Sequence, residues 1–128
     1  MMISMKQVLI VEADTLLGEV LAELFRYWGF EVDLQRSVAD AFNQPHVHPL
    51  DLVVFSSHSF HMTAKDLDCL FHEMGMYPEA RVILLTTRNL TGAEIRALPS
   101  QCTWLRLPFS AEHLAELIPQ QSSTETLL

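Results

Sequence analysis

The sequence is short of cations and of long apolar runs, and each shortage excludes a class of protein. Eight lysine and arginine residues stand against sixteen aspartate and glutamate residues, which gives a formal net charge of −8. This balance leaves no basic field for the phosphates of a nucleic acid, so we expect no direct nucleic-acid partner. The longest apolar runs, at residues 8–11, 52–55 and 82–85, are far shorter than the ~20 residues of a membrane-spanning helix, so we expect no membrane partner.

Cysteine and glycine are also scarce, with two and four residues. Cys69 and Cys102 lack the spacing of metal ligands and are too few for a disulfide framework, which predicts ordinary thiols in a reducing compartment. No small-residue cleavage site follows the first residues, so we expect a cytoplasmic protein. The turn at residues 12–16 is acidic and has no glycine, whereas a phosphate cradle needs a glycine-rich turn. We therefore expect no flavin or nucleotide cofactor and no small-molecule substrate.

Histidine pairs offer the other conceivable metal site. His46 and His48 form one pair, and His58 and His61 form another. No thiolate or obvious acid completes a tetrahedral set around either pair, so we interpret them as surface histidines and expect no metal.

The sequence does contain enough apolar material for one folded domain. Hydrophobic residues make up 49% of the 128 positions and charged residues only 19%, which is typical of a chain with a packed core. We expect one domain over residues 1–119 and a flexible tail over residues 120–128.

Three continuous apolar runs predict strands that are buried on both faces, as in a parallel sheet covered by helices. These runs lie at residues 6–11, 51–55 and 81–85. Residues 30–34 and 103–107 alternate between apolar and polar side chains, which predicts two edge strands. Helical patterns separate the strands, so the expected fold is α/β, a doubly wound five-stranded parallel sheet with its working site at the carboxyl ends of the strands.

The helices have recognisable starts and inward faces. Asp14 can cap a helix that ends at Gly29 and turns inward Leu17, Val20, Leu21, Leu24, Phe25 and Trp28. A hydroxyl three residues before an acid, close to a capping box, begins further segments at Ser37, Thr63 and Thr91. The last helix begins at Ser110, ends at Pro119 and turns inward Leu114, Leu117 and Ile118.

These segments resemble, in order and spacing, the receiver domains of bacterial two-component response regulators. The resemblance covers roughly residues 6–118 and is carried by residues 8–14, 29–34, 37–42, 51–56, 82–87 and 104–114. It implies the flavodoxin-like (βα)5 receiver fold. It also implies an ancestral chemistry in which a partner kinase's histidine passes phosphate to an aspartate beside a bound Mg²⁺.

The same resemblance implies that the phosphorylation pocket is degenerate, as in a pseudo-receiver. Five positions of this chain match the pocket of the family: Glu12, Ala13, Ser56, Thr86 and Leu107. Ser56 stands at the phosphoacceptor position, Ala13 at that of the second metal-binding acid, and Leu107 at that of the lysine. The nucleophile, one metal ligand and one stabilising cation are therefore missing, so we expect neither phosphorylation nor enzyme activity.

Two residues near the pocket admit more than one interpretation. Asp14 is either a residual metal ligand or a helix cap, and we favour the cap. Glu12 is either solvated or hydrogen-bonded to Ser56 or Thr86. An enzyme acting through Ser56 is the least favoured function, since the sequence around it lacks the glycine-flanked nucleophile of hydrolases.

We therefore predict a phosphorylation-independent interaction module in signalling or transcription regulation, with a protein partner or a second copy as its ligand. The alternative is an N-terminal dimerisation domain of a longer response regulator. The resemblance implies an interface on the fourth helix, fifth strand and fifth helix, which here includes Ile95, Arg96, Trp104, Arg106, His113 and Glu116. Trp104 is either an anchor of this interface or packs inward over Thr86.

Overall fold

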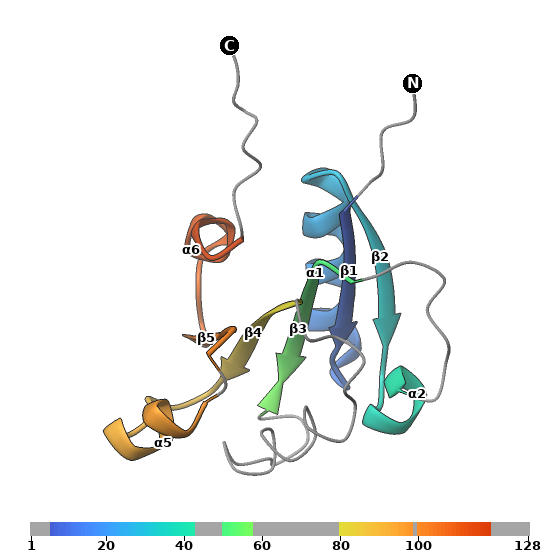
Figure 1. Ribbon diagram of the computed structural model, residues 1–128. Coiled ribbons are helices and arrows are strands. Elements are labelled where there is room, and N and C mark those ends of the chain that lie inside the picture. Colours follow the sequence, from blue (N-terminus) through green and yellow to red (C-terminus); the bar gives the residue numbers. More distant parts are fainter. Residues whose placement is uncertain (1–5, 43–49, 58–79, 99, 119–128) are drawn as a thin grey trace.

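Five parallel strands form one sheet in the computed structural model, which describes residues 6–42, 50–57, 80–98 and 100–118. The strand order is β2-β1-β3-β4-β5 (Figure 1). The bounds are β1 Lys6–Val11, β2 Phe30–Gln35, β3 Leu52–Ser56, β4 Arg81–Thr86 and β5 Cys102–Arg106. The predicted parallel sheet is confirmed, and the two alternating segments, β2 and β5, are its edges.

The central strands are buried along most of their length. Every residue of β3 is buried, and β4 is buried from its second residue onward. Side chains that alternate along a strand point to opposite faces, so continuous apolar runs can fill the core on both sides of the sheet. Two clusters of buried residues do so, one around Val8, Ile10 and Val54 and the other around Leu9, Val53 and Phe55.

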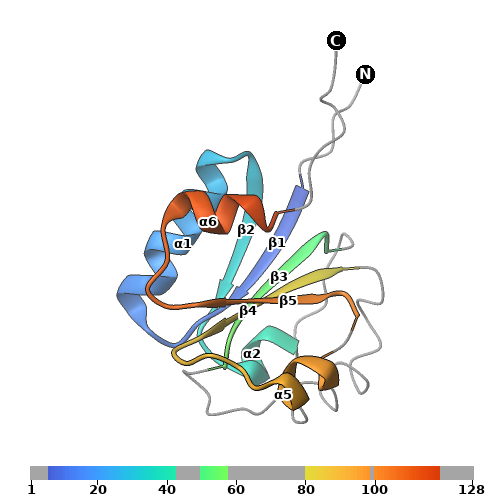
Figure 2. The same cartoon turned by 90° about the vertical axis from the view of Figure 1, so that its left-hand side faces the viewer.

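Helices cover both faces of the sheet (Figure 2). On one face lie α1 (Thr15–Tyr27) and α6 (Ala111–Glu116), whose Leu21, Phe25 and Leu114 belong to the first cluster. On the other face lie α2 (Val38–Phe42) and α5 (Gly92–Ala97). The molecule is therefore a three-layer α/β structure, as the sequence predicts.

The predicted helix starts are present in the described residues. The Asp14 side chain accepts a hydrogen bond from the Leu17 N–H, and Thr91 forms a reciprocal capping box with Glu94. Ser37 accepts from the Asp40 N–H at 3.0 Å, and Ser110 accepts from the His113 N–H. Each cap satisfies N–H groups that the first turn of a helix leaves without partners.

The predicted inward face of α1 is wrong at Val20, which is 47% exposed. The buried residues of α1 are Gly18, Leu21, Ala22 and Phe25. Gly18 and Ala22 carry little side chain, so a pattern that counts only large apolar residues misses them. Because these two small residues face the sheet, the helix is rotated about its own axis relative to the predicted orientation. Val20 therefore lies toward solvent.

Several predictions fall on segments outside the described residues. They are the helix start at Thr63, the histidines from 46 to 61, Cys69 and the tail 120–128. Among the residues that the structure does describe, no helix is long and apolar enough to cross a membrane.

Candidate functional site

Three polar side chains meet at the carboxyl ends of neighbouring strands. Ser56 is the last residue of β3, Thr86 is the last residue of β4, and Glu12 directly follows β1. These strands are adjacent in the sheet, so the order of strands alone brings the three residues to one edge. Glu12 and Ser56 are fully buried and Thr86 is 3% exposed. The pocket predicted from the sequence is thus assembled, but its polar groups lie beneath the surface.

Glu12 takes part in a hydrogen-bond network that ties two strand ends together. The hydroxyl of Ser56 donates a hydrogen bond to Oε1 of Glu12. The backbone N–H of Asp14 donates to Oε2 at 2.9 Å, and the N–H of Glu12 itself donates to the Gln35 carbonyl at 3.0 Å. Of the interpretations open for Glu12, the hydrogen bond to Ser56 is therefore the observed one.

Thr86 makes its hydrogen bond within its own loop. Its hydroxyl donates to the backbone carbonyl of Arg88 at 2.7 Å. The Arg88 guanidinium in turn donates to both carboxylate oxygens of Glu94, at 2.8 and 2.5 Å. This hydrogen bond, helped by the Thr91 N–H, lowers the pKa of Glu94 to about 2. Hydrogen bonds in the loop after β4 thus connect Thr86, in the pocket, with Glu94 in the first turn of α5.

The remaining pocket positions bring no charge. Ala13 is exposed and Leu107 is half-buried. The Leu107 N–H donates to the Thr86 carbonyl at 2.7 Å, and the peptide bond from Leu107 to Pro108 is cis. Asp14 is exposed and caps α1, so the cap that we favoured is confirmed. Within the described ranges, no three His, Cys, Asp or Glu side chains are grouped to hold a metal ion.

Sequence analysis missed one cation beside the pocket, Arg36. Its Nη1 donates to the Asp14 carbonyl at 3.3 Å, and its Nη2 lies 3.9 Å from a carboxylate oxygen of Glu19. Gly18 lies close to this side chain, since a Cβ there would lie 3.1 Å from Nη1, a tight contact, and 3.6 Å from the Cγ of Glu12, an ordinary van der Waals distance. A signal was present, because Arg36 follows a predicted strand whose carboxyl end had to point to this edge.

The predicted interface residues lie on three elements around the β5 edge. Ile95 and Arg96 are exposed on α5, Arg106 is exposed on β5, and His113 and Glu116 are exposed on α6. Trp104 is half-buried and packs against the apolar cluster beneath α2 and α5. Burial also raises the pKa of the neighbouring Cys102 thiol to about 12, which keeps the thiol protonated at neutral pH.

Comparison with solved structures identifies the fold. The chemotaxis protein CheY4 of Vibrio cholerae matches 88% of this chain and 95% of its own, with a TM-score of 0.74 at 20% identity. A Burkholderia pseudomallei response regulator, solved with a phosphorylated aspartic acid and a calcium ion, matches 93% of this chain and 69% of its own (TM-score 0.71, 16% identity). The receiver domain of an HD domain-containing protein from Pseudomonas fluorescens gives 0.69 at 19% identity, over 89% of this chain and 91% of its own.

By sequence, no family model and no curated protein matches the chain. The structural likeness nonetheless covers 88 to 93% of the chain. The chain therefore has the fold of CheY-like response-regulator receiver domains.

Proposed function

We propose that this protein is a signalling module of the receiver fold that binds a protein partner without being phosphorylated. The observation that carries the proposal is the buried hydrogen bond from Ser56 to Glu12. The Ser56 hydroxyl occupies the position of the phosphoacceptor. It donates its proton in a hydrogen bond to the Glu12 carboxylate, which is the group that a metal ion would need. The polar side chains of the pocket are thus hydrogen-bonded to one another and to the neighbouring backbone.

Two features disfavour a reaction at Ser56: its hydroxyl would have to lose a proton, and its oxygen is buried. A serine oxygen must lose its proton to attack phosphorus or carbon, and a neighbouring base must receive that proton. Glu12 is the group in contact, but both residues are fully buried, so the Ser56 oxygen is closed to a phosphodonor or other substrate as long as its hydroxyl is bonded to Glu12. The absence of enzyme activity is therefore part of the proposal.

The partner surface that we propose is the exposed face around β5. Arg96 and Arg106 are exposed there, and so are Glu112 and Glu116 on α6. Opposite charges on one face can pair across a two-fold axis, where a surface meets its own copy. Since Trp104 packs against the core, Arg106 is the better candidate for the central contact.

The test of phosphorylation is a mass measurement. After incubation with Mg²⁺ and acetyl phosphate, we expect an unchanged intact mass, whereas one transferred phosphoryl group adds about 80 Da. The reason is that Ser56 is neutral and buried, and that Ala13 and Leu107 supply neither a metal ligand nor a cation. A working receiver domain treated in parallel shows that the donor is active. An added phosphoryl group on an acid near the pocket would contradict the proposal.

The test of the interface is the oligomeric state. Arg106→Glu reverses a charge on the proposed face, so we expect the dissociation constant of the dimer to rise at least about tenfold, which corresponds to about 1.4 kcal/mol. Sedimentation velocity over a range of concentrations measures this constant. The matched control is Arg26→Glu, the same charge reversal at an exposed position of α1. Equal dimerisation of both variants excludes this face, and a monomeric wild type excludes the second copy as the partner.

A further inference from the structure

The carboxylate of Glu12 is a buried negative charge, and the hydrogen bonds that it accepts bring no positive charge. Glu12 is fully buried, and its oxygens accept from the Ser56 hydroxyl and the Asp14 N–H. Both of these donors are neutral groups. A charge that is taken out of water is costly unless an opposite charge or a metal ion compensates it. The pocket is therefore expected to have a cation close to Glu12.

The side chains of the pocket do not fit the metal ion that the resemblance implies. Mg²⁺ requires oxygen ligands in a nearly octahedral arrangement. The side chain of Ala13 has no oxygen, and the Asp14 carboxylate accepts the Leu17 N–H at 2.9 Å as the cap of α1. Glu12 is the remaining carboxylate, and both of its oxygens already accept hydrogen bonds. In the part of the chain that the structure describes, no three His, Cys, Asp or Glu side chains come together as metal ligands do.

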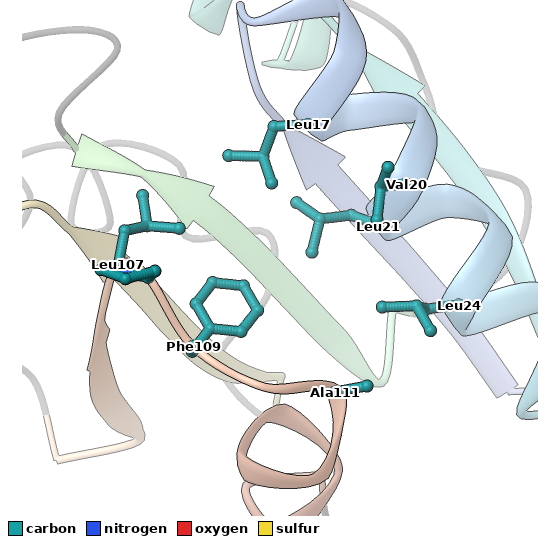
Figure 3. A pocket seen from close by; sticks show the side chains of 8 residues that line it. Leu17, Val20, Leu21, Leu24, Leu107, Phe109 and Ala111 are labelled. Carbon is teal, nitrogen blue, oxygen red and sulfur yellow. The ribbon is translucent and has the colours of Figure 1, made fainter.

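The residue after β5 does not supply the cation either. The resemblance places a lysine at position 107, but here Leu107 contributes an apolar side chain to a groove. Figure 3 shows Leu107 and Phe109 across this groove from Leu17 and Leu21 of α1. The groove encloses about 370 Å³, and every residue that lines it is apolar. Position 107 thus makes hydrophobic contacts and brings no charge.

A cation reaches the pocket from β2 instead. Arg36 directly follows β2, and the residue before it is held at the pocket because the Glu12 N–H donates to the Gln35 carbonyl at 3.0 Å. The Arg36 Nη1 donates to the Asp14 carbonyl at 3.3 Å. The Asp14 N–H in turn donates to Oε2 of Glu12 at 2.9 Å. The guanidinium and the carboxylate are therefore hydrogen-bonded to the same residue.

The missing side chain of Gly18 leaves the guanidinium and the carboxylate close to each other. Gly18 is buried in α1. The position that its Cβ would take lies 3.1 Å from Nη1 of Arg36 and 3.6 Å from Cγ of Glu12. The two charged groups thus approach one point from different elements. Attraction between opposite charges is strong where protein excludes water from part of their surroundings.

Arg36 also lies near an acid on the surface, Glu19, whose carboxylate oxygen is 3.9 Å from Nη2. The Glu19 side chain is 64% exposed, and ion pairs in solvent contribute little to stability. Glu12, in contrast, is fully buried. It is therefore the acid for which the charge of Arg36 matters most.

We propose that Arg36 is the counter-ion of Glu12 and stands in place of the metal ion that the resemblance implies. A guanidinium keeps its charge throughout the physiological pH range, and this one is covalently attached to the end of β2. The negative charge of the pocket is therefore compensated at any concentration of divalent ions. This inference goes beyond the proposed function, because it concerns the charge of the pocket and not the partner surface around β5.

A double-mutant cycle tests the pairing of the two charges. Arg36→Gln is expected to raise the equilibrium constant of unfolding, measured in urea, at least about fivefold, because a buried charge loses its compensation. In a Glu12→Gln background the same change should alter this constant less than about twofold. The contact with Glu19 is present in both backgrounds, so it cancels in the comparison.

The matched control for the cycle is Arg26→Gln, which removes an exposed cation of α1. Its effect on the unfolding constant should stay below about twofold in both backgrounds. An equal effect of Arg36→Gln in both backgrounds would overturn the inference.

Binding of Mn²⁺ is a second readout, which a purely structural role of Arg36 would not change. Ala13→Asp places a second acid next to Glu12, and the electron paramagnetic resonance signal of free Mn²⁺ measures binding. We expect Ala13→Asp/Arg36→Gln to bind Mn²⁺ at least about tenfold more tightly than Ala13→Asp, because no guanidinium then repels the ion. Ala13→Asp/Arg26→Gln removes a charge about 18 Å farther along α1 and should match Ala13→Asp within about twofold. Equal Mn²⁺ affinity with and without Arg36, including the absence of binding in both, contradicts the proposal, and so does a rise in the Tm of the wild type on adding Mg²⁺.

Discussion

The triple variant Ala13→Asp/Ser56→Asp/Leu107→Lys is expected to become phosphorylated by acetyl phosphate in the presence of Mg²⁺, whereas Ser56→Asp alone stays unmodified. In the triple variant an acceptor carboxylate, a second metal ligand and a cation are all present. In the single variant, a new carboxylate is placed where Ser56 now donates to Glu12. Two buried carboxylates without a metal repel each other, so one of them holds a proton and is a poor nucleophile.

Intact mass and thermal unfolding measure the two parts of this expectation. The triple variant should gain about 80 Da, and Mg²⁺ should raise its Tm, because an ion that binds only the folded state stabilises it. The control is Ala13→Asp/Leu107→Lys, which keeps Ser56 and should gain no mass. Full phosphorylation of the single variant would show that neither the second acid nor the lysine is required.

Ser56→Ala is expected to lower the free energy of unfolding by about 3 kcal/mol, since it removes a hydrogen-bond donor to a buried carboxylate. Ser57→Ala is a matched control, because the Ser57 hydroxyl is also nearly buried but donates to the neutral Leu85 carbonyl at 3.1 Å. For this control we expect a loss of about 1 kcal/mol. Urea unfolding measures both, and an unchanged slope shows that the change is one of stability.

A double-mutant cycle assigns the loss to the hydrogen bond. In a Glu12→Gln background the acceptor is neutral, so removal of the Ser56 hydroxyl should cost only about 1 kcal/mol. The difference between the two losses of unfolding free energy, one in each background, is the contribution of the Glu12 charge to the hydrogen bond. If Ser56→Ala costs the same in both, the bond to Glu12 is not what stabilises this edge of the sheet.

The strands could be placed from the sequence because each carries a local pattern that depends little on its neighbours. The continuous run at Lys6–Val11 has the predicted bounds, and the last strand, Cys102–Arg106, begins and ends one residue before the predicted segment. Buried parallel strands leave no polar positions inside them, so their patterns are unambiguous. Caps at Asp14, Thr91 and Ser110 likewise depend only on residues within one helical turn.

Contacts between elements were harder to predict. Glu12 had three possible environments in the sequence, and only the packing of β1 beside β3 selects Ser56. Val20 was placed inward because the pattern cannot register that Gly18 and Ala22 bring the other side of the helix against the sheet. Arg36 was missed because its partners, Asp14 and Glu19, are distant in sequence and come close only in the folded sheet.

The internal hydrogen bond of the pocket has a consequence for how information would pass through this protein. A ligand or modification changes a conformational balance only when it interacts differently with the two states. With Ser56 already bonded to Glu12, the acceptor position offers no such difference to a phosphodonor. Under the proposed function, occupancy of the partner then follows mass action, set by the number of copies that synthesis and degradation leave in the cell. The signal from such a module is its own concentration, which changes on the timescale of protein turnover.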